Sequence, residues 1–175
     1  MTAEESLVVS LRFGDSLVAC TEVIASGGIA DVLALDLNKK LVYEYEFKRS
    51  SQDLKINEPK KSKYQLVKCH KWFTKEEMKK IDAKKSWAIY YENNPKPNKF
   101  YFVVTKELWK KEEEYLKSLP NIGVIVFYLH NEKYVFETVR KCGLNKSNLH
   151  NFNQLQKIML LRISSSLANE LRGKK

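Results

Sequence analysis

Residues 27–48 place charged side chains inside two runs that otherwise have the composition of buried β-strands. The runs GGIADVLAL and LVYEYEFK flank a short turn at residues 37–40. Four charged residues interrupt their apolar pattern: Asp31, Glu44, Glu46 and Lys48. A carboxylate in apolar surroundings costs free energy unless it is paired or binds a metal ion. The fold must therefore supply a cation to these carboxylates, either from Lys48 or from a metal.

Residues 41–48 alternate cleanly between apolar and charged side chains, which predicts a strand with two different faces. One face would carry Leu41, Tyr43, Tyr45 and Phe47, and the other Val42, Glu44, Glu46 and Lys48. If Asp31 lies opposite Glu46 on a neighbouring strand, their Cβ atoms are within ~5–8 Å of each other, close enough to share an ion. A solvated face shows the same alternation, so the pattern alone does not select a function.

Length and composition are those of one globular domain over residues 1–175, with 43% apolar and 30% charged residues. The net charge of +10 favours a polyanionic partner, with nucleic acid first and an anionic membrane surface second. No apolar run reaches the ~20 residues of a membrane span. The acidic N-terminus lacks the basic region of a signal peptide. We therefore expect an intracellular protein, cytoplasmic or nucleoid-associated.

The three widely spaced cysteines predict reduced thiols rather than disulfides or structural zinc.

Periodicity and capping signals predict an α/β order with a central mixed sheet flanked by helices. A capping box formed by Thr2 and Glu5 opens the first helix. Helices are expected at 2–12, 60–72, 74–84 and 106–119, with a C-terminal helix from about 153, over 154–172. Strands are expected at 17–24, 29–35, 41–48, 87–91 and 99–105, and a hairpin at 124–129 and 133–139.

The charged face of residues 41–48 fits a site for phosphodiester hydrolysis, which needs a positioned water and a sink for developing negative charge. Mg²⁺ prefers oxygen ligands and often takes only one or two carboxylates. Asp31 and Glu46 would supply these ligands, and Lys48 would stand beside the ion. The alternative is a buried ion-pair cluster of the same three residues without any metal.

Asp31, fourteen intervening residues and then Glu46-Phe47-Lys48 form a spaced motif. On this motif and the order of elements, the chain resembles the PD-(D/E)xK nuclease superfamily, and within it the MmcB-like group. Four segments carry the closer likeness: Thr21-Glu22-Val23, Ala30-Asp31-Val32, Glu46-Phe47-Lys48-Arg49-Ser50 leading into Gln52-Asp53-Leu54, and residues 97–104. The resemblance covers residues 17–140. Ala30 stands where the superfamily name has a proline.

The resemblance implies a restriction-endonuclease-like fold and an endonuclease that uses Mg²⁺ or Mn²⁺ to hydrolyse DNA in repair, recombination or mobile-element and defence biology. It makes Asp31 and Glu46 metal ligands, Lys48 the catalytic lysine, and the backbone carbonyl of Phe47 a further ligand. Glu22 and Glu5 are the candidates for a third acid, and Glu22 fits the closer likeness.

Other polar residues near the motif are expected in supporting roles. Glu44 would assist a second ion, support the metal ligands or remain solvated. Gln65 would contact phosphate, order Lys48 or be an ordinary polar residue of the surface. Asp53 either caps the turn that follows Ser50 or serves the site. The residues expected to contact phosphate are Lys55, Lys60, Lys61 and Lys63.

Two other classes of function compete with the nuclease. One is a nucleic-acid-binding module that keeps the fold without catalysis, and the other is a structural or assembly protein whose basic surface aids solubility. A homodimer would suit an enzyme that cuts two strands, although no feature of the sequence requires one.

Overall fold

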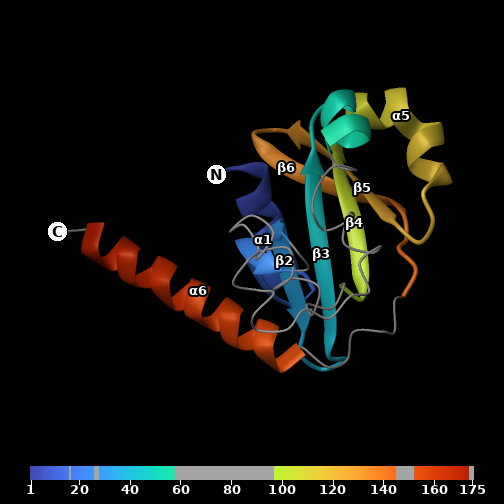
Figure 1. Cartoon of the computed structure of the whole chain (residues 1–175). Helices are drawn as coiled ribbons and strands as arrows, with labels where there is room; N and C mark the ends of the chain where they lie inside the picture. The colour runs from blue at the N-terminus through green and yellow to red at the C-terminus, as the bar shows by residue number, and fades with distance from the viewer. Residues whose placement is uncertain (16, 26–27, 58–96, 145–151, 174–175) are drawn as a thin grey trace, which may run out of the picture.

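The computed structural model describes residues 1–15, 17–25, 28–57, 97–144 and 152–173 (Figure 1). The helices expected at 60–72 and 74–84 and the strand expected at 87–91 lie outside the described residues. Four candidate site residues also fall outside them: Lys60, Lys61, Lys63 and Gln65.

The described chain forms one mixed β-sheet with helices on both of its faces (Figure 1). In chain order the elements are α1 (Ala3–Phe13), β1 (Val18–Ala25), β2 (Gly28–Asp36), β3 (Leu41–Lys48), the π-helical turn η1 (Asp53–Asn57), β4 (Lys99–Thr105), α5 (Lys106–Ser118), β5 (Gly123–His130), β6 (Lys133–Arg140) and α6 (Phe152–Gly173). The six strands lie in the order β1-β2-β3-β4-β5-β6. Strand β4 runs parallel to both β3 and β5, and the other pairs are antiparallel. The predicted α/β class with a central mixed sheet is confirmed.

Helix α1 begins at the predicted capping box. The Glu5 N–H donates to Thr2 Oγ1 at 3.2 Å, and the Thr2 N–H donates to Glu5 Oε2 at 2.7 Å. These bonds satisfy two of the N–H groups that a helix start leaves without intrahelical partners. The apolar side of the helix, with Leu7 and Leu11, packs on one face of the sheet.

That face of the sheet is apolar and aromatic. Its β3 residues Tyr45 and Phe47 pack with Tyr101 and Val103 of the neighbouring strand β4. The rings of Tyr45 and Tyr101 are stacked, with centroids 5.4 Å apart and planes 16° from parallel. This half of the predicted alternation in β3 therefore forms the core under α1.

The opposite face of the sheet holds two separate apolar clusters. The first, called here the α6 cluster, joins Cys20, Leu33, Leu35 and Val42 to Phe152, Leu155 and Met159. The second, the α5 cluster, joins Phe102, Val104, Val124 and Val126 to Leu54, Leu108 and Leu116. The charged residues of β3 lie between them, because Glu44 pairs in register with Leu33 on one side and with Phe100 on the other. Helix α6 continues beyond the sheet toward its C-terminal end (Figure 1).

None of the described helices combines the length and apolar character that crossing a membrane requires.

Candidate functional site

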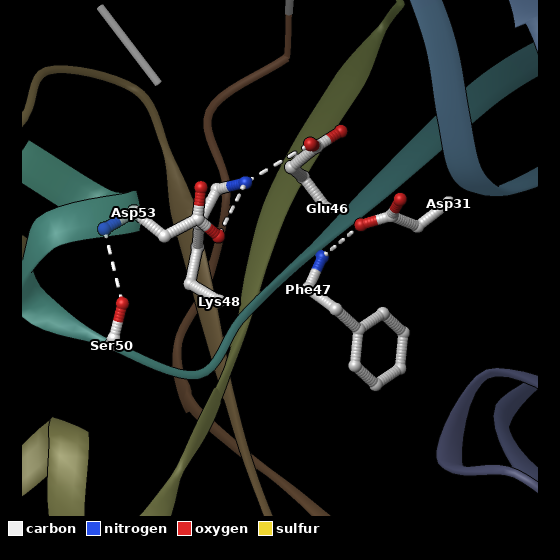
Figure 2. Close-up of polar contacts among 6 residues, drawn as sticks. All are labelled: Asp31, Glu46, Phe47, Lys48, Ser50 and Asp53. Atoms are coloured by element: carbon white, nitrogen blue, oxygen red, sulfur yellow. Dashed lines mark hydrogen bonds and ion pairs between the residues drawn. The ribbon is translucent and has the colours of Figure 1, made fainter. Parts of the chain in front are cut away.

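The site begins where the ladder between β2 and β3 stops. Val32 and Tyr45 are the last paired residues at this end, and one further step in the same register would bring Asp31 opposite Glu46. The Phe47 N–H donates a hydrogen bond to the Asp31 carboxylate at 2.7 Å (Figure 2). The two predicted ligands Asp31 and Glu46 thus lie just beyond the same end of the ladder between β2 and β3.

Lys48 lies on the same face of β3 as Glu46, because side chains two residues apart in a strand point the same way. Its Nζ is 3.0 Å from Glu46 Oε1 and 3.4 Å from Asp53 Oδ2 (Figure 2). The exposed fractions of the Lys48 and Glu46 side chains are 2% and 1%, whereas Asp53 is 37% exposed. Removing one partner of a buried pair is strongly destabilising, since it leaves the other charge uncompensated. Glu46 and Lys48 must therefore be considered as one unit.

The turn after β3 directs Asp53 toward Lys48. The Asp53 N–H donates to Ser50 Oγ at 3.1 Å, and the Leu54 N–H donates to the Ser50 carbonyl at 3.0 Å. Leu54 is anchored in the α5 cluster at 1% exposure. Of the two roles open to Asp53, the cap belongs to Ser50, which leaves the Asp53 side chain to bind Lys48. A serine three residues before Asp53 was the available signal for this arrangement.

Glu44 is buried at 2% exposure, two residues before Glu46 and on the same face of β3. This placement removes the possibility that it is a solvated carboxylate. Its assistance to a second ion stays a prediction.

The candidates for a third acid have other partners. Glu22 has a left-handed backbone (φ 52°), and its pairing with Asp31 is missing from the otherwise regular ladder between β1 and β2. Its carboxylate, 73% exposed, binds Arg162 of α6 at 2.9 Å. Glu5 takes part in the capping box of α1, the helix on the other face of the sheet. The contribution of either carboxylate to a metal site stays a prediction.

Lys55 was expected to contact phosphate, and the structure gives it partners within the protein. Its ammonium forms an ion pair with the Glu112 carboxylate and lies 5.1 Å from the centre of the Tyr115 ring. The hydrogen bond from Lys55, followed by one from Ser51, lowers the pKa of Glu112 below its ordinary value. Lys55 therefore fastens η1 to α5.

In the part of the chain that is described, no three His, Cys, Asp or Glu side chains are grouped closely enough to hold a metal ion. Asp31 and Glu46, just beyond the end of the ladder between β2 and β3, are an all-oxygen pair. Such a pair fits Mg²⁺, which commonly takes one or two carboxylates and completes its shell with water and phosphate. It does not fit zinc, which favours nitrogen and sulfur donors.

Fold and site together define an α/β protein whose mixed sheet carries a buried cluster of opposite charges on one face. The fold is similar to that of a protein of unknown function from Silicibacter pomeroyi. The alignment has a TM-score of 0.55 and 18% sequence identity, and it covers 93% of this chain and 84% of the other. At this identity the likeness concerns the fold alone. No family model and no curated protein matches the chain.

Proposed function

We propose that this protein is a divalent-metal-dependent endonuclease of the PD-(D/E)xK type that hydrolyses phosphodiester bonds in DNA. One observation supports the proposal: continuing the register of β2 and β3 would place Asp31 opposite Glu46, and the Lys48 ammonium lies 3.0 Å from Glu46 Oε1. This placement agrees with the spaced motif. Antiparallel pairing of β2 with β3 brings the two ends of the fourteen-residue interval near each other.

Each side chain would have a distinct task. Asp31 and Glu46, with the backbone carbonyl of Phe47, would hold Mg²⁺ or Mn²⁺. When bound, the ion would stabilise the negative charge that develops on the phosphate. Lys48 would orient the attacking water through its N–H groups or stabilise the same developing charge. The hydrogen bond from the Phe47 N–H would keep the Asp31 carboxylate aimed at the site.

The structural alternative is an ion-pair cluster that only holds the strands together. A structural cluster does not need buried charge, because apolar residues of similar volume are often as stabilising or more so. Here Glu44, Glu46 and Lys48 are all at 2% exposure or less, in a strand flanked by two apolar clusters that could have been continuous. Retaining charge at that cost favours a chemical role.

The net charge of +10 supports a polyanionic substrate. DNA is proposed from the resemblance to DNA-repair nucleases, and a location in the cytoplasm or at the nucleoid follows from that substrate. A homodimer would place two sites on the two strands of a duplex.

A nicking assay on supercoiled plasmid, with the full chain and either Mg²⁺ or Mn²⁺, tests the proposal. We expect Glu46→Gln and Lys48→Met each to lower the nicking rate by about 100-fold or more, the usual scale for removing an acid–base group. Because removing one partner of the buried pair costs stability, both variants are assayed below their own unfolding temperatures, where salt-sensitive DNA affinity should persist. Glu113→Gln removes an exposed carboxylate of α5 that pairs with Lys117, so it serves as the matched control.

Two results would contradict the proposal. Cleavage at the wild-type rate in both variants would show that these residues are not the site. Salt-sensitive binding by the wild-type protein without cleavage, under any divalent metal, would instead identify a nucleic-acid-binding module.

A further inference from the structure

We infer that Asp53 is a positioning residue that holds the Lys48 ammonium when a divalent cation binds Glu46. The inference rests on the proposed function and deepens it. It starts from one contact in Figure 2: Lys48 Nζ lies between two carboxylates, 3.0 Å from Glu46 Oε1 and 3.4 Å from Asp53 Oδ2.

Glu46 faces competing demands in the proposed enzyme. Its carboxylate lies closer to the Lys48 ammonium than that of Asp53 does, and it is also a proposed ligand of the metal. A divalent cation at Glu46 would repel the ammonium beside it, and this repulsion is strong because both side chains are almost completely buried. Metal binding and the ion pair with Lys48 are therefore in competition for one carboxylate.

Asp53 can resolve that competition because it belongs to a different element. Glu46 and Lys48 share β3, whereas Asp53 is held in η1 by the Ser50 hydroxyl and by the anchored neighbour Leu54. It is 37% exposed, so its charge costs less to keep than that of Glu46. With Asp53 present, the ammonium can move away from Glu46 and still keep a carboxylate contact, so it stays next to the reaction.

The inference predicts opposite effects of two substitutions on metal affinity. Asp53→Asn should weaken Mn²⁺ binding about tenfold, because Lys48 loses its carboxylate contact in η1 and then competes harder with the metal for Glu46. Lys48→Met should tighten Mn²⁺ binding by about tenfold, because the competing cation is gone. In the Lys48→Met background, adding Asp53→Asn should weaken Mn²⁺ binding by only about twofold or less.

The experiment is isothermal titration of the full chain with Mn²⁺ alone, without DNA, on the wild type, the two single variants and the double variant. Glu113→Gln should leave the affinity unchanged, which controls for the loss of a carboxylate elsewhere. Ser50→Ala should weaken Mn²⁺ binding in the same direction as Asp53→Asn but less, because it loosens the turn. Asp53→Glu keeps the carboxylate and should recover most of the wild-type affinity, and it remains informative if Asp53→Asn fails to fold.

The outcomes separate the inference from the proposed function. If Asp53→Asn weakened Mn²⁺ binding equally in the wild type and in Lys48→Met, Asp53 would act on the metal directly, and the positioning role would be wrong. Unchanged affinity in Asp53→Asn would overturn it as well. A wild-type protein that binds no Mn²⁺ would overturn the metal site itself, and with it the nuclease proposal.

Discussion

The Asp31 carboxylate accepts the backbone N–H of Phe47 at 2.7 Å, so a side chain of β2 completes the pairing of β3 where the ladder has ended. An amide oxygen can accept the same hydrogen bond, but a methyl group cannot. The free energy of unfolding of Asp31→Asn should therefore lie within about 0.5 kcal/mol of the wild-type value. That of Asp31→Ala should be lower by about 1–3 kcal/mol, because the Phe47 N–H loses the carboxylate that accepts its hydrogen bond. Urea denaturation measures both.

The same pair of variants separates charge from hydrogen bonding. If Asp31→Asn were as destabilised as Asp31→Ala, the negative charge itself would hold the strands, and the metal-free ion cluster would be the better interpretation. Under the nuclease proposal, Asp31→Asn should remain folded and lose its metal-dependent nicking.

Glu22 offers a direct test of the third acid. Its carboxylate is largely exposed and bound to Arg162, and exposed pairs of this kind contribute about 0–1 kcal/mol to stability. We expect Glu22→Gln to change the unfolding free energy by about 0.5 kcal/mol or less and to keep nicking within about tenfold of the wild type. A loss of nicking as large as that of Glu46→Gln would establish Glu22 as a ligand.

The link between Lys55 and Glu112 predicts a dependence of stability on pH. Because the folded-state pKa of Glu112 lies below its ordinary value of 4.5, the folded state favours the ionised carboxylate. The stabilisation should be fully present above pH 4.5 and should disappear as the pH falls through the lowered pKa. Glu112→Gln lacks the charge at every pH. Its difference in unfolding free energy from the wild type, measured in urea at pH 7 and at stepwise lower pH, should therefore shrink under acid. A difference that stays constant from pH 7 to well below 4.5 would contradict this prediction.

Gly123 is a position where packing leaves no room for a side chain. A Cβ there would lie 2.3 Å from two ring atoms of Tyr101 and 2.9 Å from the Cβ of Cys142. The Tyr101 ring is stacked on Tyr45 and cannot retreat on that side. Gly123→Ala should therefore cost about 1–3 kcal/mol of stability, the range for overpacking a core.

Gly143→Ala is the matched control for this overpacking. Its Cβ would first meet Asn121 Oδ1 at 2.8 Å, the end of an exposed side chain that can rotate away. It should cost about 0.5 kcal/mol or less, as most surface substitutions do. Equal losses in the two variants, measured by thermal unfolding, would show that the backbone freedom of glycine matters more than the space around Tyr101.

Local signals accounted for much of the fold. Strict alternation predicted β3 with the bounds Leu41–Lys48 that the structure has, and an unbroken apolar and aromatic run predicted β4 over Lys99–Thr105. The Thr2–Glu5 capping box predicted the start of α1. These succeed because each depends on neighbours within a few residues along the chain.

The partners of the charged residues were less predictable, since they depend on contacts between distant segments. No sequence pattern links Lys55 to Glu112 or Glu22 to Arg162, because these pairs form only after the sheet has placed η1 against α5 and β1 against α6. The left-handed backbone at Glu22 also lacks the glycine or asparagine that usually marks it. The placement of Asp31 and Glu46 near the same end of adjacent strands was predictable, because a single hairpin joins β2 to β3.

Under the proposed function, the anchoring of Leu54 in the α5 cluster would have a mechanical consequence for catalysis. Asp53 would position Lys48 only as accurately as its neighbour Leu54 is held among Leu108, Leu116 and Val124. Apolar core residues that make no contact with phosphate would thereby determine how precisely the Lys48 ammonium is positioned at the phosphate. A cavity introduced into the α5 cluster would therefore misplace Lys48 at the end of β3. The resulting loss of turnover would come from weakened packing, although every reactive group would still be present.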